Sequence, residues 1–126
     1  MANFIKASIK DNATTPEYFI AEGCFITELS NSADDPAVSI ARARLEPGQT
    51  TRWHYLRGTT ERYVVLRGAG LVEVDELPAQ HVGSGDVVII PAGARQRISN
   101  TGSDDLVFLA ICAPRFTPLA YVDIES

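Results

Sequence analysis

The sequence predicts an all-β protein, and three observations support this prediction. From Val38 onward, short apolar or alternating runs are separated by turn residues about every eight to twelve positions, a pattern typical of a β-sandwich or barrel. Clusters such as Glu46–Gly48 and Gly83–Gly85 supply residues that accept turn geometry. The intervals between these clusters leave little room for a helix.

The elements are expected in the following order. Before the β-rich region we expect a short helical turn around Pro16–Phe19, a strand at Cys24–Leu29 and a loop at Asn31–Pro36, where Asn, Ser, Asp and Pro are concentrated. One domain over residues 1–126 is expected, because a chain of this length can bury a core without disulfides or a structural metal. Further strands are expected near residues 38–45, 51–56, 61–67, 70–75, 79–82, 86–90, 95–99 and 105–112.

Composition narrows the classes of partner. The chain has 16 acidic and 11 basic residues, which argues against nucleic acid or an anionic membrane as partner. It contains no apolar stretch near the roughly 18 residues of a membrane span, and its first residues lack an apolar signal core, so a cytoplasmic protein is expected. Cys24 and Cys112 are expected to be buried reduced thiols, with a disulfide as the alternative.

Two stretches carry glycine, histidine, glutamate and proline at a regular spacing. The first, residues 48–68, reads G-x5-H-x-L-x4-E-x6-G, and the second, residues 85–100, reads G-x5-P-x-G-x2-Q-x3-N. This spacing resembles the double motif of the cupin family, and the resemblance covers roughly positions 38–113. The positions concerned are Gly48, His54, Leu56, Glu61 and Gly68 in the first stretch and Gly85, Pro91, Gly93, Gln96 and Asn100 in the second.

The resemblance implies a cupin-type double-stranded β-helix, which is a jelly-roll barrel. It also implies a divalent metal ion, with nickel, iron, manganese and zinc all compatible with the donor types. The metal ligands would be His54, Glu61 and Gln96. Leu56 and Gln96 stand where typical cupins have histidines, so this ligand set differs from the usual one. The alternative is a metal-free hydrogen-bonded cluster, or a site for an organic ligand.

Strand alternation predicts which side chains share a face. Arg52 and His54 share one parity, as do Glu61 and Tyr63, and in a cupin these faces point into the barrel together with Gln96. A buried carboxylate is costly without a partner, so Glu61 without metal would have a raised pKa and could transfer protons. Arg52 is a candidate clamp for a substrate carboxylate, or a solvated residue at the strand entrance.

A third catalytic candidate and one excluded histidine complete the site predictions. The catalytic candidates are Glu61, Arg52 and Tyr63. Tyr63 is expected either to donate a hydrogen bond from its hydroxyl to a ligand or only to pack in the core. His81 lies outside both motifs and is expected in an exposed turn.

The predicted function is that of a metal-dependent small-molecule enzyme acting on a carbonyl, enol or carboxylate substrate. Dioxygenase, isomerase and decarboxylase reactions all remain open, since fold alone does not select a reaction. The alternative function is a non-catalytic module that binds or senses a small ligand. The strand expected at 105–112 is apolar on both parities, so one face needs a cover from the N-terminal strand, the C-terminal segment or a second subunit. A homodimer is expected.

Overall fold

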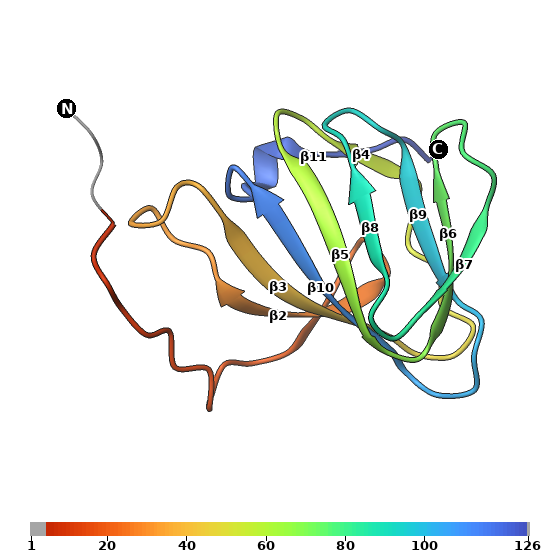
Figure 1. Cartoon of the computed structure of the whole chain (residues 1–126), viewed down its shortest axis with the longest axis horizontal. Helices are drawn as coiled ribbons and strands as arrows, with labels where there is room; N and C mark the ends of the chain where they lie inside the picture. The colour runs from red at the N-terminus through yellow and green to blue at the C-terminus, as the bar shows by residue number, and fades with distance from the viewer. Residues whose placement is uncertain (1–4, 126) are drawn as a thin grey trace.

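The computed structural model describes residues 5–125 and shows two antiparallel sheets that face each other (Figure 1). The predicted double-stranded β-helix is confirmed. In spatial order the six-stranded sheet consists of β1 (Tyr18–Ile20), β2 (Cys24–Ser30), β3 (Ser39–Leu45), β10 (Leu106–Ala113), β5 (Thr60–Arg67) and β8 (Val87–Ile90). The five-stranded sheet consists of β11 (Tyr121–Asp123), β4 (His54–Leu56), β9 (Gln96–Asn100), β6 (Ala69–Val74) and β7 (Gln80–Gly83).

Helical structure is limited to the short 3-10 helix η1 (Pro118–Ala120) within the residues described. Within the same range, no helix has the length and apolar character needed to cross a bilayer. Both cysteines are buried free thiols, as the sequence predicted.

The predictions for the N-terminal region and for β4 need correction. The helical turn expected around Pro16–Phe19 is wrong, because Tyr18 begins β1 and pairs in antiparallel register with Ile26 of β2. So short a segment takes its conformation from its pairing partner and not from local propensity. The strand expected at 51–56 is shorter and begins at His54, while Thr50 forms only an isolated bridge with Ser99.

Motif residues at one end of the barrel fix its turns. Gly68 has a φ of +90°, and a Cβ atom there would lie 2.6 Å from the carbonyl oxygen of Asp105. The Asn100 side-chain amide donates to the backbone oxygens of Leu45 and Asp104, both at 2.9 Å. This end is therefore set by backbone geometry that only a few residue types can satisfy.

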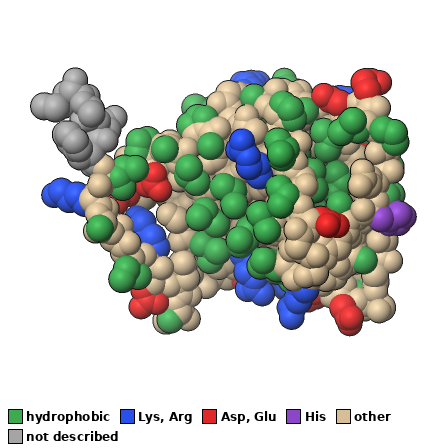
Figure 2. Space-filling view, viewed as in Figure 1, with side chains coloured by type: hydrophobic (Ala, Val, Ile, Leu, Met, Phe, Trp, Pro, Cys, Tyr) green, Lys and Arg blue, Asp and Glu red, His purple; other side chains and the backbone are tan. Residues whose placement is uncertain are grey.

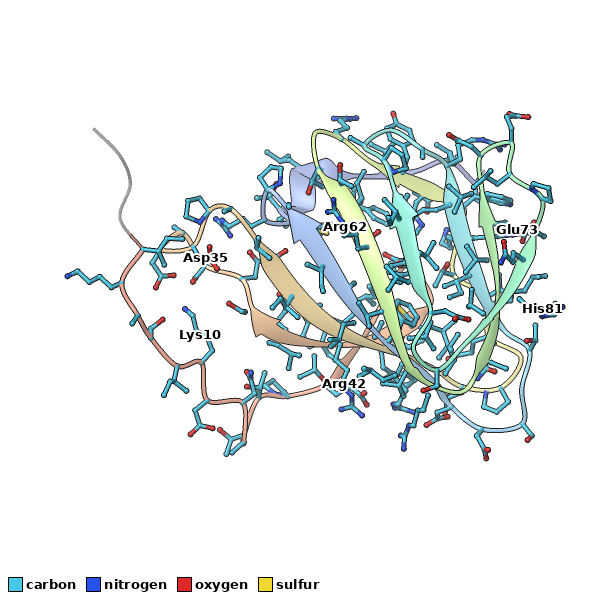
Figure 3. All side chains as sticks on the ribbon, viewed as in Figure 1. Lys10, Asp35, Arg42, Arg62, Glu73 and His81 are labelled. Carbon is cyan, nitrogen blue, oxygen red and sulfur yellow. The ribbon has the colours of Figure 1, made fainter. Side chains whose placement is uncertain are left out.

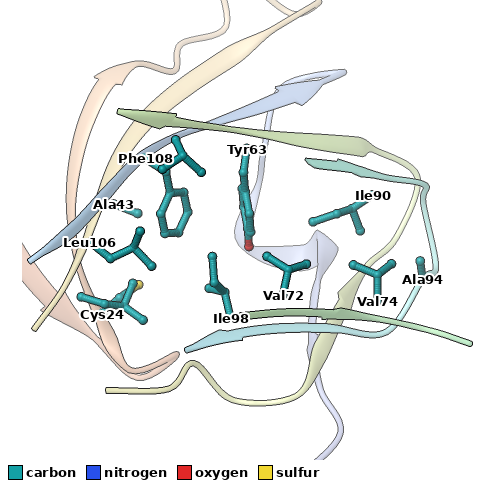
Figure 4. Close-up of a cluster of buried hydrophobic side chains, with 12 residues drawn as sticks. Cys24, Ala43, Tyr63, Val72, Val74, Ile90, Ala94, Ile98, Leu106 and Phe108 are labelled. Carbon is teal, nitrogen blue, oxygen red and sulfur yellow. The ribbon is translucent and has the colours of Figure 1, made fainter. Parts of the chain in front are cut away.

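The core fills the space between the two sheets (Figure 4). The ring of Tyr63 packs against Phe108 with centroids 4.4 Å apart, so this tyrosine belongs to the core as well as to the polar site. Burying one such large apolar side chain contributes about 1.5–3 kcal/mol. The other fully buried side chains include Leu45, Val65, Ile90, Ile98 and Leu106.

The outward face of the six-stranded sheet is also apolar. Figure 2 shows hydrophobic side chains gathered across this side of the molecule. Val87 and Ile89 of β8 are 56% and 60% exposed. The outer apolar patch consists of Val64, Val87, Ile89, Leu109 and Ile111. The strand register places Leu109, Val64 and Val87 side by side, and Ile111 and Ile89 lie on either side of the exposed Arg62.

Candidate functional site

The predicted metal-ligand residues lie inside the barrel, at the end opposite the Gly68 turn. His54 begins β4, Gln96 begins β9, and the two are paired in the strand register. Glu61 lies near the start of β5. His54 and Gln96 are each 1% exposed and Glu61 is 9% exposed. Alternation along the strands therefore predicted the inward direction of all three side chains.

A hydrogen-bond chain joins three of the predicted residues. The Tyr63 hydroxyl donates to Oε1 of Gln96 at 2.6 Å, and Nε2 of Gln96 donates to Oε1 of Glu61 at 2.9 Å. The thiol of Cys112 lies 3.8 Å from the second carboxylate oxygen of Glu61. Both ends of the Gln96 amide are thus engaged, which fixes its orientation as buried polar groups require.

Glu22 belongs to this site and was missed by the sequence analysis. It lies in the connection between β1 and β2, and its Oε2 is 3.8 Å from Nε2 of His54. On the other side of the ring, Nδ1 of His54 is 2.7 Å from the carbonyl oxygen of Arg52. Because a carbonyl only accepts, Nδ1 of the neutral imidazole carries the proton and the lone pair of Nε2 faces Glu22.

Strand alternation does not extend to Glu22, because residues 21–23 form a turn and Gly23 has a φ of +105°. No pattern in the sequence therefore indicates the direction of this side chain.

Burial changes the proton affinity of the acidic side chains. It raises the pKa of Glu61 to about 7, with a further contribution from the negative charge of Glu22. Burial likewise raises the pKa of Glu22 to about 7. The pKa of His54 is lowered by burial, which keeps the imidazole neutral. At neutral pH both acids can therefore exchange protons with a bound ligand.

Tyr121 is a second residue that the motifs did not indicate. It begins β11, and its ring stacks on His54 with centroids 5.0 Å apart and planes 26° apart. Among the residues described, its buried hydroxyl has no hydrogen-bond partner. An unpaired buried hydroxyl is a group that a water or a ligand can satisfy.

Arg52 does not contact the buried cluster through its side chain. Its Nε lies 2.5 Å from Oδ2 of Asp123, and the side chain is 39% exposed. Arg52 precedes β4, so strand alternation does not govern its direction. Its role as a carboxylate clamp remains a prediction.

His81 is exposed as predicted and lies at the edge of the molecule (Figure 3), but it belongs to strand β7 and not to a turn.

A cavity of about 150 Å³ lies against the Glu61 side of the cluster. We call it the Glu61 cavity. One end is polar and the remaining wall is mainly apolar, so a ligand would meet both kinds of surface. Its lining includes the polar residues Glu22, Glu28, Ser39, Glu61, Tyr63 and Cys112, and the apolar residues Ile20, Ile26, Ala43, Phe108, Ala110 and Phe116.

The predicted metal ligands offer only part of a metal site in this arrangement. Nε2 of His54 and the carboxylate of Glu61 are suitable donors, whereas the Gln96 oxygen already accepts the Tyr63 hydrogen bond. Within residues 5–125, no group of three His, Cys, Asp or Glu side chains is placed to hold a metal ion. Leu56 is 4% exposed and cannot coordinate. A third protein donor would require either the Gln96 amide or the Glu22 carboxylate, whose Oε2 lies 3.8 Å from Nε2 of His54, to turn.

These features define a small β-barrel protein with a single enclosed polar site beside a cavity. The sequence pattern of the cupin domain matches residues 41–112, which is more than half of the chain. The protein therefore belongs to the cupin family.

Relatives agree with this assignment. An oxalate-binding protein of Thermotoga maritima is 37% identical over 71 residues, and the match spans 56% of this chain and 58% of the relative's length. A predicted oxalate decarboxylase from the same organism superposes with a TM-score of 0.74 at 26% identity, over 85% of this chain and 99% of that one. A Streptomyces nucleoside dehydratase superposes with a TM-score of 0.78 at 17% identity, over 95% and 92% of the two chains. At that identity the likeness shows the fold alone.

Proposed function

We propose that the protein is a cupin enzyme that binds one small molecule in the Glu61 cavity and transfers a proton to or from it. The observation that carries this proposal is Glu61 itself. Its carboxyl group is buried, its pKa is raised to about 7, and Gln96 and Tyr63 hold it in place beside the cavity. A carboxyl group in that state is suited to general acid–base chemistry near neutral pH.

The two acids divide the chemistry between them. The pKa of each acid is raised to about 7, and the negative charge of Glu22 contributes to the raised pKa of Glu61, which favours a state with one proton between them. In its carboxylate form, Glu61 takes a proton from a carbon next to a carbonyl group. The electron pair of that C–H bond moves to the carbonyl oxygen, and Glu22 in its acid form protonates the oxygen. The product is an enol, and return of a proton to another carbon gives an isomer.

Solvent exchange tests this proposal without knowledge of the natural substrate. Cyclohexanone and hydroxyacetone are incubated with the untagged protein in heavy water, and exchange of the α-protons is followed by NMR. Glu61→Gln should slow the catalysed exchange by about 100-fold or more, while Glu76→Gln, on the exposed β6–β7 turn, should not change it. Equal exchange in wild type and Glu61→Gln would overturn the proposal. Binding without exchange would favour the alternative of a non-catalytic ligand-binding module.

A second candidate function is the metal-dependent enzyme that the sequence predicted. One observation favours it: Nδ1 of His54 is fixed by a backbone carbonyl and Nε2 is left free, which is the usual setting of a metal-binding histidine. His54 and Glu61, with Gln96 after rotation of its amide, would hold nickel, iron, manganese or zinc. Such an ion supplies Lewis-acid chemistry when bound. The relative's name suggests oxalate as a ligand, and such a dianion would need this cation in a cavity lined by carboxyl groups.

Metal analysis of the untagged protein tests this candidate. Stoichiometric metal that is lost in both His54→Ala and Glu61→Ala would support it. Metal-free wild-type protein that does not take up added nickel, iron, manganese or zinc would contradict it.

We further propose that a second copy of the chain covers the outer apolar patch, giving a homodimer. Exposed contiguous apolar surface of this kind marks interfaces, and two-fold homo-oligomers are the commonest assemblies. Light scattering should give twice the chain mass for the wild type and the monomer mass for Ile89→Lys. A wild-type monomer at all concentrations would contradict this proposal.

A further inference from the structure

We propose that the Glu61 cavity selects ligands the size of one six-membered ring that carry an uncharged or positively charged polar group, and that it excludes carboxylates. This inference rests on the proposed function, because it names the ligand class of the same site. It is carried by the size of the cavity, the character of its walls and the sign of the charges that line it.

Size and wall character set the body of the ligand. A cavity of about 150 Å³ is comparable to the engineered apolar cavities of roughly that volume that hold one benzene molecule. Ile20, Ile26 and Phe108 form part of its apolar wall, and small alanines widen the space. A ring or a compact branched aliphatic group would fill it, whereas a purely polar molecule would leave the apolar wall without contacts.

The charged residues that line the cavity are all acidic. They are Glu22, Glu28 and Glu61, and the described lining contains no Lys, Arg or His side chain. The polar end therefore consists of carboxyl groups, the Ser39 hydroxyl, the Cys112 thiol and the Tyr63 hydroxyl, the last of which already donates to Gln96. A ligand that enters must donate hydrogen bonds to these carboxylate oxygens. A negatively charged ligand would instead be repelled by them.

Three arginines elsewhere in the barrel do not correct this imbalance, because other acids hold them. Arg44 pairs with Glu17 at 2.7 Å and with Asp105 at 3.1 Å. Arg97 pairs with Glu73 at 2.7 Å, on the opposite sheet. Arg52, predicted from the sequence to clamp a carboxylate, pairs instead with Asp123, as described above. None of these three arginines lines the cavity.

The consequence is discrimination by charge. An ammonium or hydroxyl group donates hydrogen bonds to the buried carboxyl groups, and the charged donor forms the stronger bond. A carboxylate of the same size meets no cation and only the neutral donors of Tyr18, Ser39 and Cys112, so its desolvation is compensated far less than that of an ammonium group.

Three probes of nearly equal shape test the inference: benzylamine, benzyl alcohol and benzoate. Their affinities are measured by calorimetry on metal-free protein at about pH 8, where the first is a cation and the last an anion. We expect benzylamine to bind about tenfold or more tightly than benzyl alcohol, and benzoate to show no saturable binding. In the Glu22→Gln, Glu61→Gln double variant the advantage of benzylamine should fall to about twofold or less. Glu76→Gln should retain it, since Glu76 is exposed and lies outside the cavity.

Several outcomes would overturn the inference. They are saturable benzoate binding as tight as that of benzyl alcohol, a benzylamine preference that survives in the double variant, and failure of all three probes to bind. The proposed function fails separately: charge-selective binding without α-proton exchange would leave this inference standing and overturn the enzyme. α-Proton exchange that requires carboxylate-bearing substrates would overturn this inference and leave the proposed enzyme function standing.

Discussion

The two ends of the barrel differ in what holds them together. At one end, Gly68 and Asn100 meet the backbone of neighbouring strands, through close approach in the first case and two hydrogen bonds in the second. At the other end, Glu61 and Gln96 contact each other through their side chains, and His54 pairs with Gln96 in the strand register. Residues at the first end match the cupin motifs, whereas Gln96 departs from them at the second.

This difference shows how one scaffold can carry varied chemistry. Side chains that face a cavity can change without altering the turns that position the strands, because the turns depend on a separate set of backbone contacts. Removal of a residue from the first end should therefore mainly change stability. Removal of a residue from the second should mainly change proton affinity and ligand preference.

The largest expected effect comes from replacing one glycine at each end of the barrel with valine. Gly68→Val places a branched side chain 2.6 Å from the Asp105 carbonyl oxygen in a backbone with φ of +90°, and should destabilise the protein by about 4 kcal/mol or more. Gly93→Val has a φ of +83° but no atom within 4 Å of the added Cβ, so only backbone strain of about 1–3 kcal/mol is expected. Urea unfolding of both variants measures the two losses.

Equal losses in the two glycine variants would contradict the distinction between the two ends. Wild-type stability in both would show that neither turn restrains the fold.

Much of this architecture could be predicted because its determinants are local. Turns with positive φ need residues such as Gly68 and Gly93, and strand alternation follows from a period of two. The inward direction of His54, Glu61 and Gln96 followed from that alternation once the strands were placed.

The remaining features could not be predicted, because they depend on contacts between distant segments. The β1 strand depends on its pairing with β2, so the local sequence around Tyr18 led to the incorrect prediction of a helical turn. Glu22 and Tyr121 reach the site from outside both motifs. Arg52 precedes the regular strand, and its direction is set by its ion pair with Asp123.

The next largest effect separates the charge of Glu61 from its hydrogen bond. The folded state raises the pKa of this carboxyl group from 4.5 to about 7, so folded protein keeps a proton that the unfolded chain loses in that range. The contribution of Glu61 to stability therefore falls as pH rises from about 4.5 to about 7. Glu61→Gln keeps the acceptor for Gln96 and removes this loss, so its stability relative to wild type should increase by about 3 kcal/mol across the same range.

The measurement for Glu61→Gln is the free energy of unfolding at about pH 4.5 and about pH 8, with Glu76→Gln as the matched surface control. The difference between variant and wild type reports the titration of Glu61 together with the smaller changes that its removal causes in the titration of Glu22 and His54. A difference that does not change with pH would show that the Glu61 carboxyl group titrates normally, and would remove the basis for its role in proton transfer.

The smallest effect is expected at the far end of the hydrogen-bond chain. Tyr63→Phe keeps the ring that packs against Phe108 and removes only the hydroxyl that donates to Gln96 at 2.6 Å. The buried amide oxygen then lacks its donor, which should cost about 1–2 kcal/mol in unfolding free energy. Tyr55→Phe, on the outward parity of β4, is the control and should cost less than about 0.5 kcal/mol. Because the freed amide can turn, Tyr63→Phe should also slow α-proton exchange severalfold. Loss of stability with unchanged exchange would mean that Tyr63 supports the core and not the orientation of Glu61.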